Sequence, residues 1–336
     1  MRAAAAGAGE LGPTDRPLLR GGRAGLSTPL TPVPSKHRVR RRTSRFRAAL
    51  FPFLVRLLSR MLGSVPRSTA LRFGRTVGRL VWSLGSRDRR RALDHLALAF
   101  PELPEEERRR IARLAFLSQG MNAAELLHLL RRDAKEILPQ IEIHGWENVE
   151  AARAAGRPIL ILTGHCGNWE LLPVPMSARG LPPAGIARPL DDPRLQEMLV
   201  SIRSHMGAAT IARGTRGAAR QILGVLRSGG AIVMLIDQDT KVDGVWVPFF
   251  GRPAFTPVGA AELALKQDMR VVPTFMERRP DGGHILWFLP ILELPDDPRE
   301  ATALMTAAIE AQIRRRPEQW VWWHKRWRRQ QAAGMG

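Results

Sequence analysis

The chain has 336 residues, of which 44% are hydrophobic and 25% are charged, and its formal net charge at pH 7 is +21. This composition is typical of a globular protein that is long enough for one large domain or two small ones. The single cysteine, Cys166, excludes an intramolecular disulfide framework and a zinc site built from cysteines.

The positive charge is concentrated near the N-terminus. Residues 16–87 contain 17 of the 52 Lys and Arg residues and no Asp or Glu, so the rest of the chain holds 35 basic and 31 acidic residues, a net charge of +4. Such a block favours polyanionic partners: a negatively charged membrane surface, an acidic carrier protein or a nucleic acid. A solvated basic arm without a fixed partner is the alternative for residues 1–45.

The first 63 residues divide into two predicted segments. Residues 1–45 are rich in Gly, Pro, Ala and Arg and lack an apolar period, which predicts a disordered arm, and they lack the apolar segment of a signal peptide. Residues 46–63 place their apolar side chains on one helical face, with arginines off that face. This segment is too short and too charged to span a bilayer, so we expect an amphipathic helix at a membrane interface, with a helix packed on the protein core as the alternative.

Residues 64–330 are expected to form the folded domain, with a helical part over 64–156 and an α/β core over 157–330. In the helical part, apolar spacing predicts helices over 71–84, 105–117 and 121–132. In the core, short apolar runs at 158–162, 231–236, 271–275 and 285–289 alternate with helical stretches after Trp169, at 218–227 and at 257–266. The alternation predicts an α/β fold with a mixed, largely parallel central sheet flanked by helices.

The strongest candidate for chemistry is a His-x4-Glu motif formed by His165 and Glu170. His165 comes just after a buried strand, and Gly167 and Asn168 allow a tight turn into a helix. We expect the Glu170 carboxylate to fold back onto one nitrogen of the imidazole, leaving the other nitrogen free to take a proton from an alcohol. Active groups gather at the carboxyl ends of strands, and Asp237 also follows an apolar run. A structural role for His165 is the alternative.

Two similar features do not indicate a site. His128 and Asp133 have the same spacing, but they lie in a predicted helix, where these positions point in different directions. Cys166 is adjacent to His165, and neighbouring side chains diverge, so the histidine is poorly placed to activate the thiol. Cysteine is also a commonly buried small residue, and we therefore expect Cys166 to be structural.

Seven segments in order resemble the bacterial lipid A biosynthesis (lauroyl/myristoyl) acyltransferase family, over about residues 50–330. They are 91–102 (RALDHLALAFPE), 163–170 (TGHCGNWE), 187–190 (ARPL), 203–207 (RSHMG), 237–239 (DQD), 247–251 (VPFFG) and 317–327 (PEQWVWWHKRW). The resemblance implies a fold like that of the glycerolipid acyltransferases. It also implies transfer of a fatty acyl group from an acyl carrier protein or coenzyme A thioester to a hydroxyl of a membrane glycolipid.

By this resemblance, His165 is the general base and Glu170 is its orienting partner. Arg203, Asp237 and Arg188 match further polar positions of the family, and with Asn168 and Gly167 they are the expected substrate-binding residues. For Arg203 and Asp237, an ion pair within the fold is the alternative. The tetrahedral oxyanion needs donors, for which we consider Arg203 or backbone N–H groups near Gly167. A thioester is already activated, so neither a metal nor a cofactor is expected.

The C-terminal segment contains Trp320, Trp322, Trp323 and Trp327 among basic residues. Such a composition can indicate an interfacial or nucleic-acid surface, but the spacing of Trp320 and Trp322 also suits a strand with one buried face. We expect at least two of the tryptophans to pack in the core, with the basic end exposed.

Taken together, the sequence predicts a peripheral or monotopic enzyme on the cytoplasmic face of a bacterial inner membrane. Its expected partners are an acidic acyl carrier protein or acyl-coenzyme A, an anionic glycolipid acceptor and the membrane surface, without a specific nucleic acid. The first choice of acceptor is a lipid A-type glycolipid, and the alternative is another anionic glycolipid or a lysophospholipid, such as a phosphatidylinositol mannoside. A non-catalytic basic protein that binds membrane or RNA, and a thiol hydrolase that uses Cys166, are the competing function classes.

Overall fold

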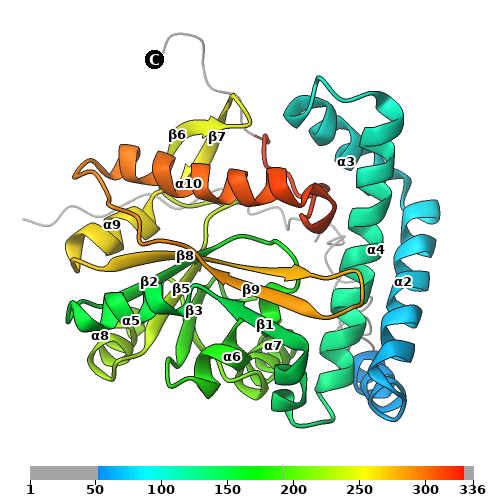
Figure 1. The fold of residues 1–336 in the computed structure, drawn as a ribbon, viewed down its shortest axis with the longest axis horizontal. Coiled ribbons are helices and arrows are strands. Elements are labelled where there is room, and N and C mark those ends of the chain that lie inside the picture. Colours follow the sequence, from blue (N-terminus) through cyan, green and yellow to red (C-terminus); the bar gives the residue numbers. More distant parts are fainter. Residues whose placement is uncertain (1–51, 191, 329–336) are drawn as a thin grey trace, which may run out of the picture. The chain divides into compact units, whose positions relative to one another are not determined.

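The computed structural model describes residues 52–190 and 192–328. The predicted arm over residues 1–45 and the first part of the predicted helix over residues 46–63 lie outside these residues. Residues 52–63 are helical, as expected. They are followed by helices α2 (Arg67–Leu84), α3 (Ser86–Ala99) and α4 (Glu105–Leu129), which stand beside one end of the sheet (Figure 1).

Helix α4 corrects the prediction of separate helices over 105–117 and 121–132, because it is continuous through Gly120. Gly120 faces Gly74 and Gly78 of α2, and a side chain at any of these three positions would collide with the backbone of the other helix. The glycine is therefore required for close packing of two helices, and the tertiary contact outweighs its low helix propensity.

The central sheet has seven strands in the order β1-β9-β8-β2-β5-β3-β4. All neighbouring strands are parallel except β8 and β9, which are antiparallel, so the predicted mixed and largely parallel sheet is confirmed. The strands are β1 (Ile141–His144), β2 (Ile159–Thr163), β3 (Pro183–Ala187), β4 (Ala209–Ala212), β5 (Ala231–Leu235), β8 (Arg270–Arg278) and β9 (His284–Phe288). A separate antiparallel hairpin is formed by β6 (Gly244–Phe249) and β7 (Arg252–Pro257).

Helices cover both faces of this sheet. In Figure 1, α9 (Gly259–Lys266) and α10 (Pro298–Arg315) lie above it, and α5 (Trp146–Ala154), α6 (Pro173–Ala178), α7 (Pro193–His205) and α8 (Ala218–Arg227) lie below it. Strand β2 accordingly reads as a continuous apolar run. Leu160 and Leu162 belong to one core cluster, and Ile159 and Ile161 belong to the cluster on the opposite face.

The order of the strands positions the site. Parallel strands β2 and β5 are direct neighbours, with Thr163 paired to Leu235 at their carboxyl ends. The loops that follow the two strands therefore emerge side by side. In an open α/β sheet this edge is where ligands bind.

Candidate active site

The centre of the site is a hydrogen-bonded pair of His165 and Asp237, each of which lies two residues beyond the end of its strand. The Nδ1 atom of His165 lies 2.8 Å from Oδ1 of Asp237, and the backbone N–H of His165 donates to Oδ2 of the same carboxylate at 2.8 Å. Trp320 adds a third hydrogen bond from Nε1 to Oδ2, also at 2.8 Å. Three donors thus fix a carboxylate that is fully buried.

The electrostatics of this pair keep Asp237 ionised. Burial alone raises the pKa of the Asp237 carboxyl, but the nearby charge and hydrogen bonds of His165, together with Trp320, lower it well below its usual range. An ionised carboxylate only accepts hydrogen bonds, so Nδ1 of His165 carries a proton, and in the neutral form of the ring Nε2 has the lone pair. That arrangement suits a base that receives a proton at Nε2.

The contact to Asp237 corrects the expected pairing of His165 with Glu170. Glu170 lies in a short 3-10 helix (Trp169–Leu171) and accepts hydrogen bonds from Arg203 at 3.3 and 3.4 Å. The physical reason is the turn at Gly167, which has a φ of 56° and directs the chain toward α7 rather than back onto the imidazole. A side chain at residue 167 would meet the carbonyl of Met276, so only glycine fits this turn.

His165 opens onto a cleft of about 850 Å³ at the carboxyl ends of β2, β3 and β5. The expected site residues Glu170, Arg188 and Arg203 all line it. Further lining residues were not identified from the sequence; the charged and imidazole side chains among these are Arg213, Asp239, Lys241, His324 and Arg328. Arg213, Asp239 and Lys241 come soon after strands β4 and β5, a position that could have indicated them. Basic side chains therefore outnumber acidic ones on the cleft wall.

Asn168 and Gly167 do not line this cleft, contrary to expectation. Asn168 is buried and donates through Nδ2 to Oε2 of Glu125 at 2.7 Å. The carbonyl of Gly167 accepts from Nδ2 of Asn122 at 2.7 Å, and its N–H donates to the carbonyl of Gln319 at 2.9 Å. Both residues attach the loop that follows β2 to helix α4 and to the C-terminal segment, and neither faces the cleft.

Glu125 is the centre of a buried ionic cluster behind this loop. Besides Asn168, its carboxylate accepts hydrogen bonds from Arg67, from Arg278 at 2.5 Å, and from His284 at 3.0 Å. Burial raises the pKa of Glu125, but His284 and Arg278 more than reverse this effect and lower it well below its usual range. The charged cluster ties α2, α4, β8 and β9 to the loop that carries His165.

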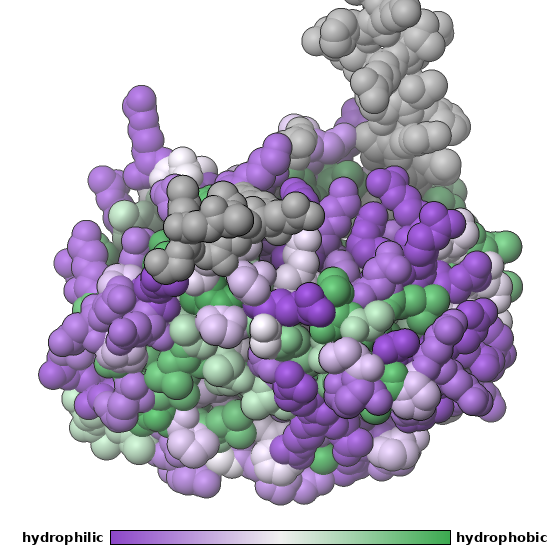
Figure 2. All heavy atoms as spheres, turned by 90° about the horizontal axis from the view of Figure 1, so that it is seen from above, coloured by the Kyte–Doolittle hydropathy of each residue, from purple (hydrophilic) through white to green (hydrophobic). Residues whose placement is uncertain are grey.

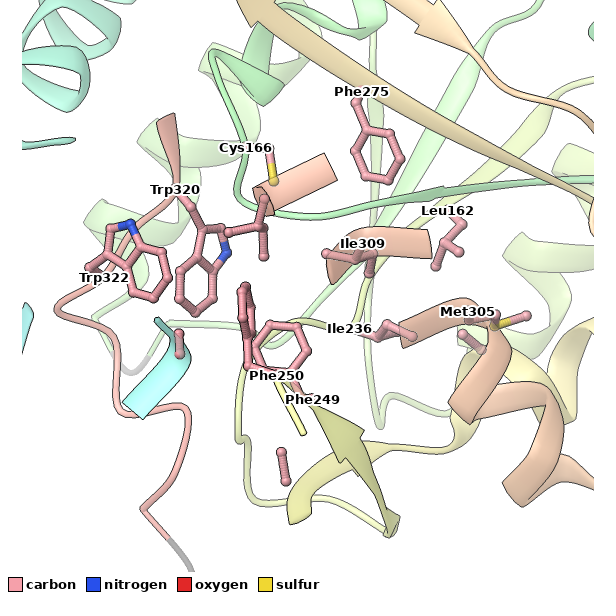
Figure 3. Packing of buried hydrophobic residues seen from close by; sticks show 14 of the residues in the cluster. Leu162, Cys166, Ile236, Phe249, Phe250, Phe275, Met305, Ile309, Trp320 and Trp322 are labelled. Atoms are coloured by element: carbon pink, nitrogen blue, oxygen red, sulfur yellow. The ribbon is translucent and has the colours of Figure 1, made fainter. Parts of the chain in front are cut away.

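Cys166 is structural, as the sequence indicated. It packs with Trp320, Phe249 and Phe250 in the apolar cluster shown in Figure 3. Burial, with a further contribution from Asp237, raises the pKa of the Cys166 thiol well above its usual value, so the thiol stays protonated. A thiolate nucleophile at this position is inconsistent with its surroundings.

The C-terminal segment completes the site. Trp320 and Trp322 are buried, as predicted for at least two tryptophans, and Trp320 forms a bridge to Cys166. The expected exposure of the basic end is wrong for Arg326, which is fully buried and donates to the Phe255 carbonyl and to Oγ1 of Thr256, both at 2.6 Å. The C-terminal segment is therefore hydrogen-bonded both to the β6–β7 hairpin and to the Asp237 carboxylate.

An α/β sheet with an imidazole–carboxylate pair at the carboxyl end of its strands, open to a basic cleft, defines a class of protein that can activate a hydroxyl for transfer chemistry. Comparison with known sequences specifies the class. Residues 38–329 match the profile of the bacterial lipid A biosynthesis acyltransferase family, so the chain belongs to this family and is an acyltransferase.

Several characterised relatives share much of its length. A lipid A biosynthesis lauroyltransferase of Escherichia coli is 28% identical over 273 residues, which cover 79% of this chain and 87% of the relative. A lipid A biosynthesis acyltransferase of Haemophilus influenzae is 25% identical over 238 residues, 70% of this chain and 74% of the relative. A phosphatidylinositol mannoside acyltransferase of Mycobacterium tuberculosis is 26% identical over 161 residues, 47% of this chain and 51% of the relative.

Proposed function

We propose that this acyltransferase moves a fatty acyl group from an acyl carrier protein or coenzyme A thioester to a hydroxyl of a lipid A-type glycolipid. The observation that carries the proposal is the His165–Asp237 pair at the wall of a basic cleft. Lipid A-type acceptors rank first because the relatives that are named for lipid A biosynthesis align over 70–79% of this chain, against 47% for the phosphatidylinositol mannoside acyltransferase, whose acceptor is the second candidate.

In this reaction His165 is the general base. Its Nε2 atom takes the proton of the acceptor hydroxyl as the hydroxyl oxygen attacks the thioester carbon. When the C–S bond of the tetrahedral intermediate breaks, the imidazolium returns the proton to the departing sulfur. Asp237 keeps the imidazole in the correct tautomer and stabilises the imidazolium. The mechanism requires no metal and no cofactor besides the thioester.

The charge of the cleft supports anionic substrates. Arg188, Arg203, Arg213, Lys241 and Arg328 line its wall. Phosphate groups of a glycolipid, or the acidic surface and phosphopantetheine of a carrier protein, would be attracted to such a wall. Glu170 orients one of these cations, Arg203, through their ion pair.

Exposed apolar side chains support membrane association. Within residues 52–190 and 192–328, no helix is both long and apolar enough to cross a bilayer. On the helix over 52–63, Phe53 and Met61 are 59% and 58% exposed, and the outer face of α2 presents Leu80 at 55% and Leu84 at 82%. Both helices lie in the region without acidic residues. An apolar stripe beside arginines is typical of a surface that inserts into the interface of an anionic bilayer.

The face seen from above α10 mixes hydrophilic and hydrophobic residues (Figure 2). The apolar stripe leads us to propose that the N-terminal helices contact the cytoplasmic leaflet of the bacterial inner membrane. Phe73 of α2 is 43% exposed and lies about two and about three helical turns before Leu80 and Leu84 on the same face. Replacing Phe73, Leu80 and Leu84 with Glu should reduce cosedimentation with anionic vesicles at least about tenfold, since each buried apolar side chain contributes about 1.5–3 kcal/mol. Leu304→Glu on α10, a leucine that is 37% exposed, is the matched control and should leave binding unchanged.

Acyl transfer itself tests the proposal. The purified protein in mixed micelles would receive labelled acyl carrier protein or acyl-coenzyme A, with an under-acylated lipid A, a phosphatidylinositol mannoside or a lysophospholipid as acceptor. We expect a singly acylated lipid A product by mass spectrometry, and its loss in His165→Ala. Transfer to the mannoside alone would establish the second acceptor, and undiminished transfer by His165→Ala would contradict the mechanism.

A further inference from the structure

The loop that follows β2 and carries His165 does not itself provide a clear hydrogen-bond donor for the oxyanion. The intermediate of acyl transfer needs hydrogen-bond donors, and the backbone N–H groups beside His165 are the natural candidates. In this fold they are already engaged: those of His165, Cys166 and Gly167 donate to Asp237, Gly164 and Gln319 respectively. These three N–H groups are therefore not free to bind the oxyanion, and a side-chain donor on the cleft wall is the alternative.

A second imidazole, His324, lines the same cleft. It lies four residues after Trp320, which donates to Asp237, and its own Nδ1 atom is enclosed without a hydrogen-bond partner among residues 52–190 and 192–328. A buried polar atom without a partner is costly in a finished fold and is common where a ligand is to bind. The ring thus lines the cleft that holds His165, and its Nδ1 atom contributes no hydrogen bond to the described part of the fold.

The turn that carries His324 is held rigidly. Helix α3 contributes two hydrogen bonds to it: Nδ1 of His95 donates to the carbonyl of Trp322 at 2.7 Å, and Nη1 of Arg91 donates to the carbonyl of Trp323 at 3.1 Å. The carbonyl of His324 itself accepts from the N–H of Arg326 at 2.9 Å. Such support is what a preorganised donor requires, because its position must not change as charge develops.

The surroundings also keep this ring neutral. Burial lowers the pKa of His324 to about 4; the Asp237 carboxylate opposes this effect, whereas His165, Arg328 and His95 add to it. At neutral pH one ring nitrogen therefore carries a proton that it can donate, and the ring does not compete with His165 as a cation.

We propose that His324 is a second catalytic group, which donates a hydrogen bond to the thioester carbonyl oxygen as this oxygen becomes negatively charged. The inference rests on the proposed acyl transfer. The acceptor oxygen bonds to the carbonyl carbon while its proton moves to His165, and the C–S bond then breaks as the sulfur takes that proton. His324 keeps its own proton throughout and contributes only the hydrogen bond.

The test compares His324→Gln, which retains an N–H donor, with His324→Leu, which has similar bulk but no donor. We expect His324→Leu to lower kcat about 10²–10³-fold, the usual effect of removing one oxyanion donor. The KM for the acyl donor should stay within about threefold, because the interaction exists only in the transition state. His324→Gln should recover at least about tenfold in kcat. His144→Gln, a change at a half-exposed histidine of β1, is the matched control and should behave as wild type.

Thermal unfolding of each variant separates a local role from a folding role. If His324→Leu does not fold, His324→Asn replaces it, and the longer amide of the Gln variant should be the more active of the two. Equal kcat values for the donor and non-donor variants, or a loss confined to KM, would overturn the inference. A wild-type protein without acyl transfer would overturn the proposed function as well, whereas active wild type with an unaffected His324→Leu variant would overturn this inference alone.

Discussion

Replacement of Asp237 by Asn is the substitution for which the structure makes the sharpest prediction. The carboxylate accepts three hydrogen bonds, two at Oδ2 from the His165 backbone and Trp320, and one at Oδ1 from Nδ1 of His165. An amide can satisfy the first two only by turning its oxygen toward them. Its NH2 group then faces Nδ1 of His165 and requires a lone pair there.

The consequence is a change of tautomer. With the proton on Nε2, the imidazole cannot accept a proton from the acceptor hydroxyl, so catalysis must use a rare form of the enzyme. A change of this kind in a histidine–carboxylate pair lowers kcat about 10⁴-fold in the well-studied serine protease case, and we expect about 10³–10⁴-fold for Asp237→Asn.

Glu170→Gln is the matched comparison, since it is also a carboxylate-to-amide change on the cleft wall. A Gln side chain still has an oxygen that can accept from Arg203, and Glu170 does not contact the reactive imidazole through any hydrogen bond found among the described residues. We expect a loss of about tenfold or less in kcat. Both variants would be assayed for acyl transfer at saturating donor. The reverse order, with Glu170→Gln inactive and Asp237→Asn near wild type, would refute the assignment.

Three further predictions concern stability. Glu125→Gln should lower the free energy of unfolding by about 3–5 kcal/mol, because it leaves the guanidinium groups of Arg278 and Arg67 without their counter-charge, and chemical denaturation would show this. Gly78→Ala should destabilise the protein by about 1–3 kcal/mol, because the new methyl group collides with the Phe116 carbonyl. Gly224→Ala in α8, where a methyl group meets open space, is the control and should be neutral or stabilising. Equal effects of the two substitutions would argue against the close contact of α2 with α4. His324 has a lower pKa in the folded state than in the unfolded state, so between about pH 6.5 and 4 the unfolded state binds one proton more. The free energy of unfolding should therefore decrease as the pH falls through this range. His324→Gln should make this decrease smaller in denaturation curves measured across the same range.

The pairing of His165 with Asp237 marks the limit of what the sequence could predict. Both residues were recognisable as candidates because each follows a buried strand. Which carboxylate reaches the imidazole depends on the order of strands in the sheet. Strands β2 and β5 are neighbours although about 70 residues separate them, and local patterns contain no information on that adjacency. The spacing in the His-x4-Glu motif favoured Glu170 only because it is close in sequence.

The other differences have the same origin in tertiary packing. Gly120 resembles a helix break, but it lies where two helices approach each other too closely for a side chain. Arg326 belongs to a basic terminal run, yet it is buried, and its hydrogen bonds to β7 satisfy the guanidinium group there. In contrast, the class of fold and the helix over 218–227 were predictable, because they follow from hydrophobic periodicity.

The position of the proton on the His165 ring can be measured by NMR. Histidine labelled with ¹⁵N would give nitrogen signals whose assignment follows from their loss in His165→Gln. We expect Nδ1 to carry the proton of the neutral His165 ring, with Nε2 unprotonated, and we expect Asp237→Asn to reverse this. A proton on Nε2 of the neutral ring in the wild-type protein, or a tautomer unaffected by Asp237→Asn, would contradict the proposed mechanism.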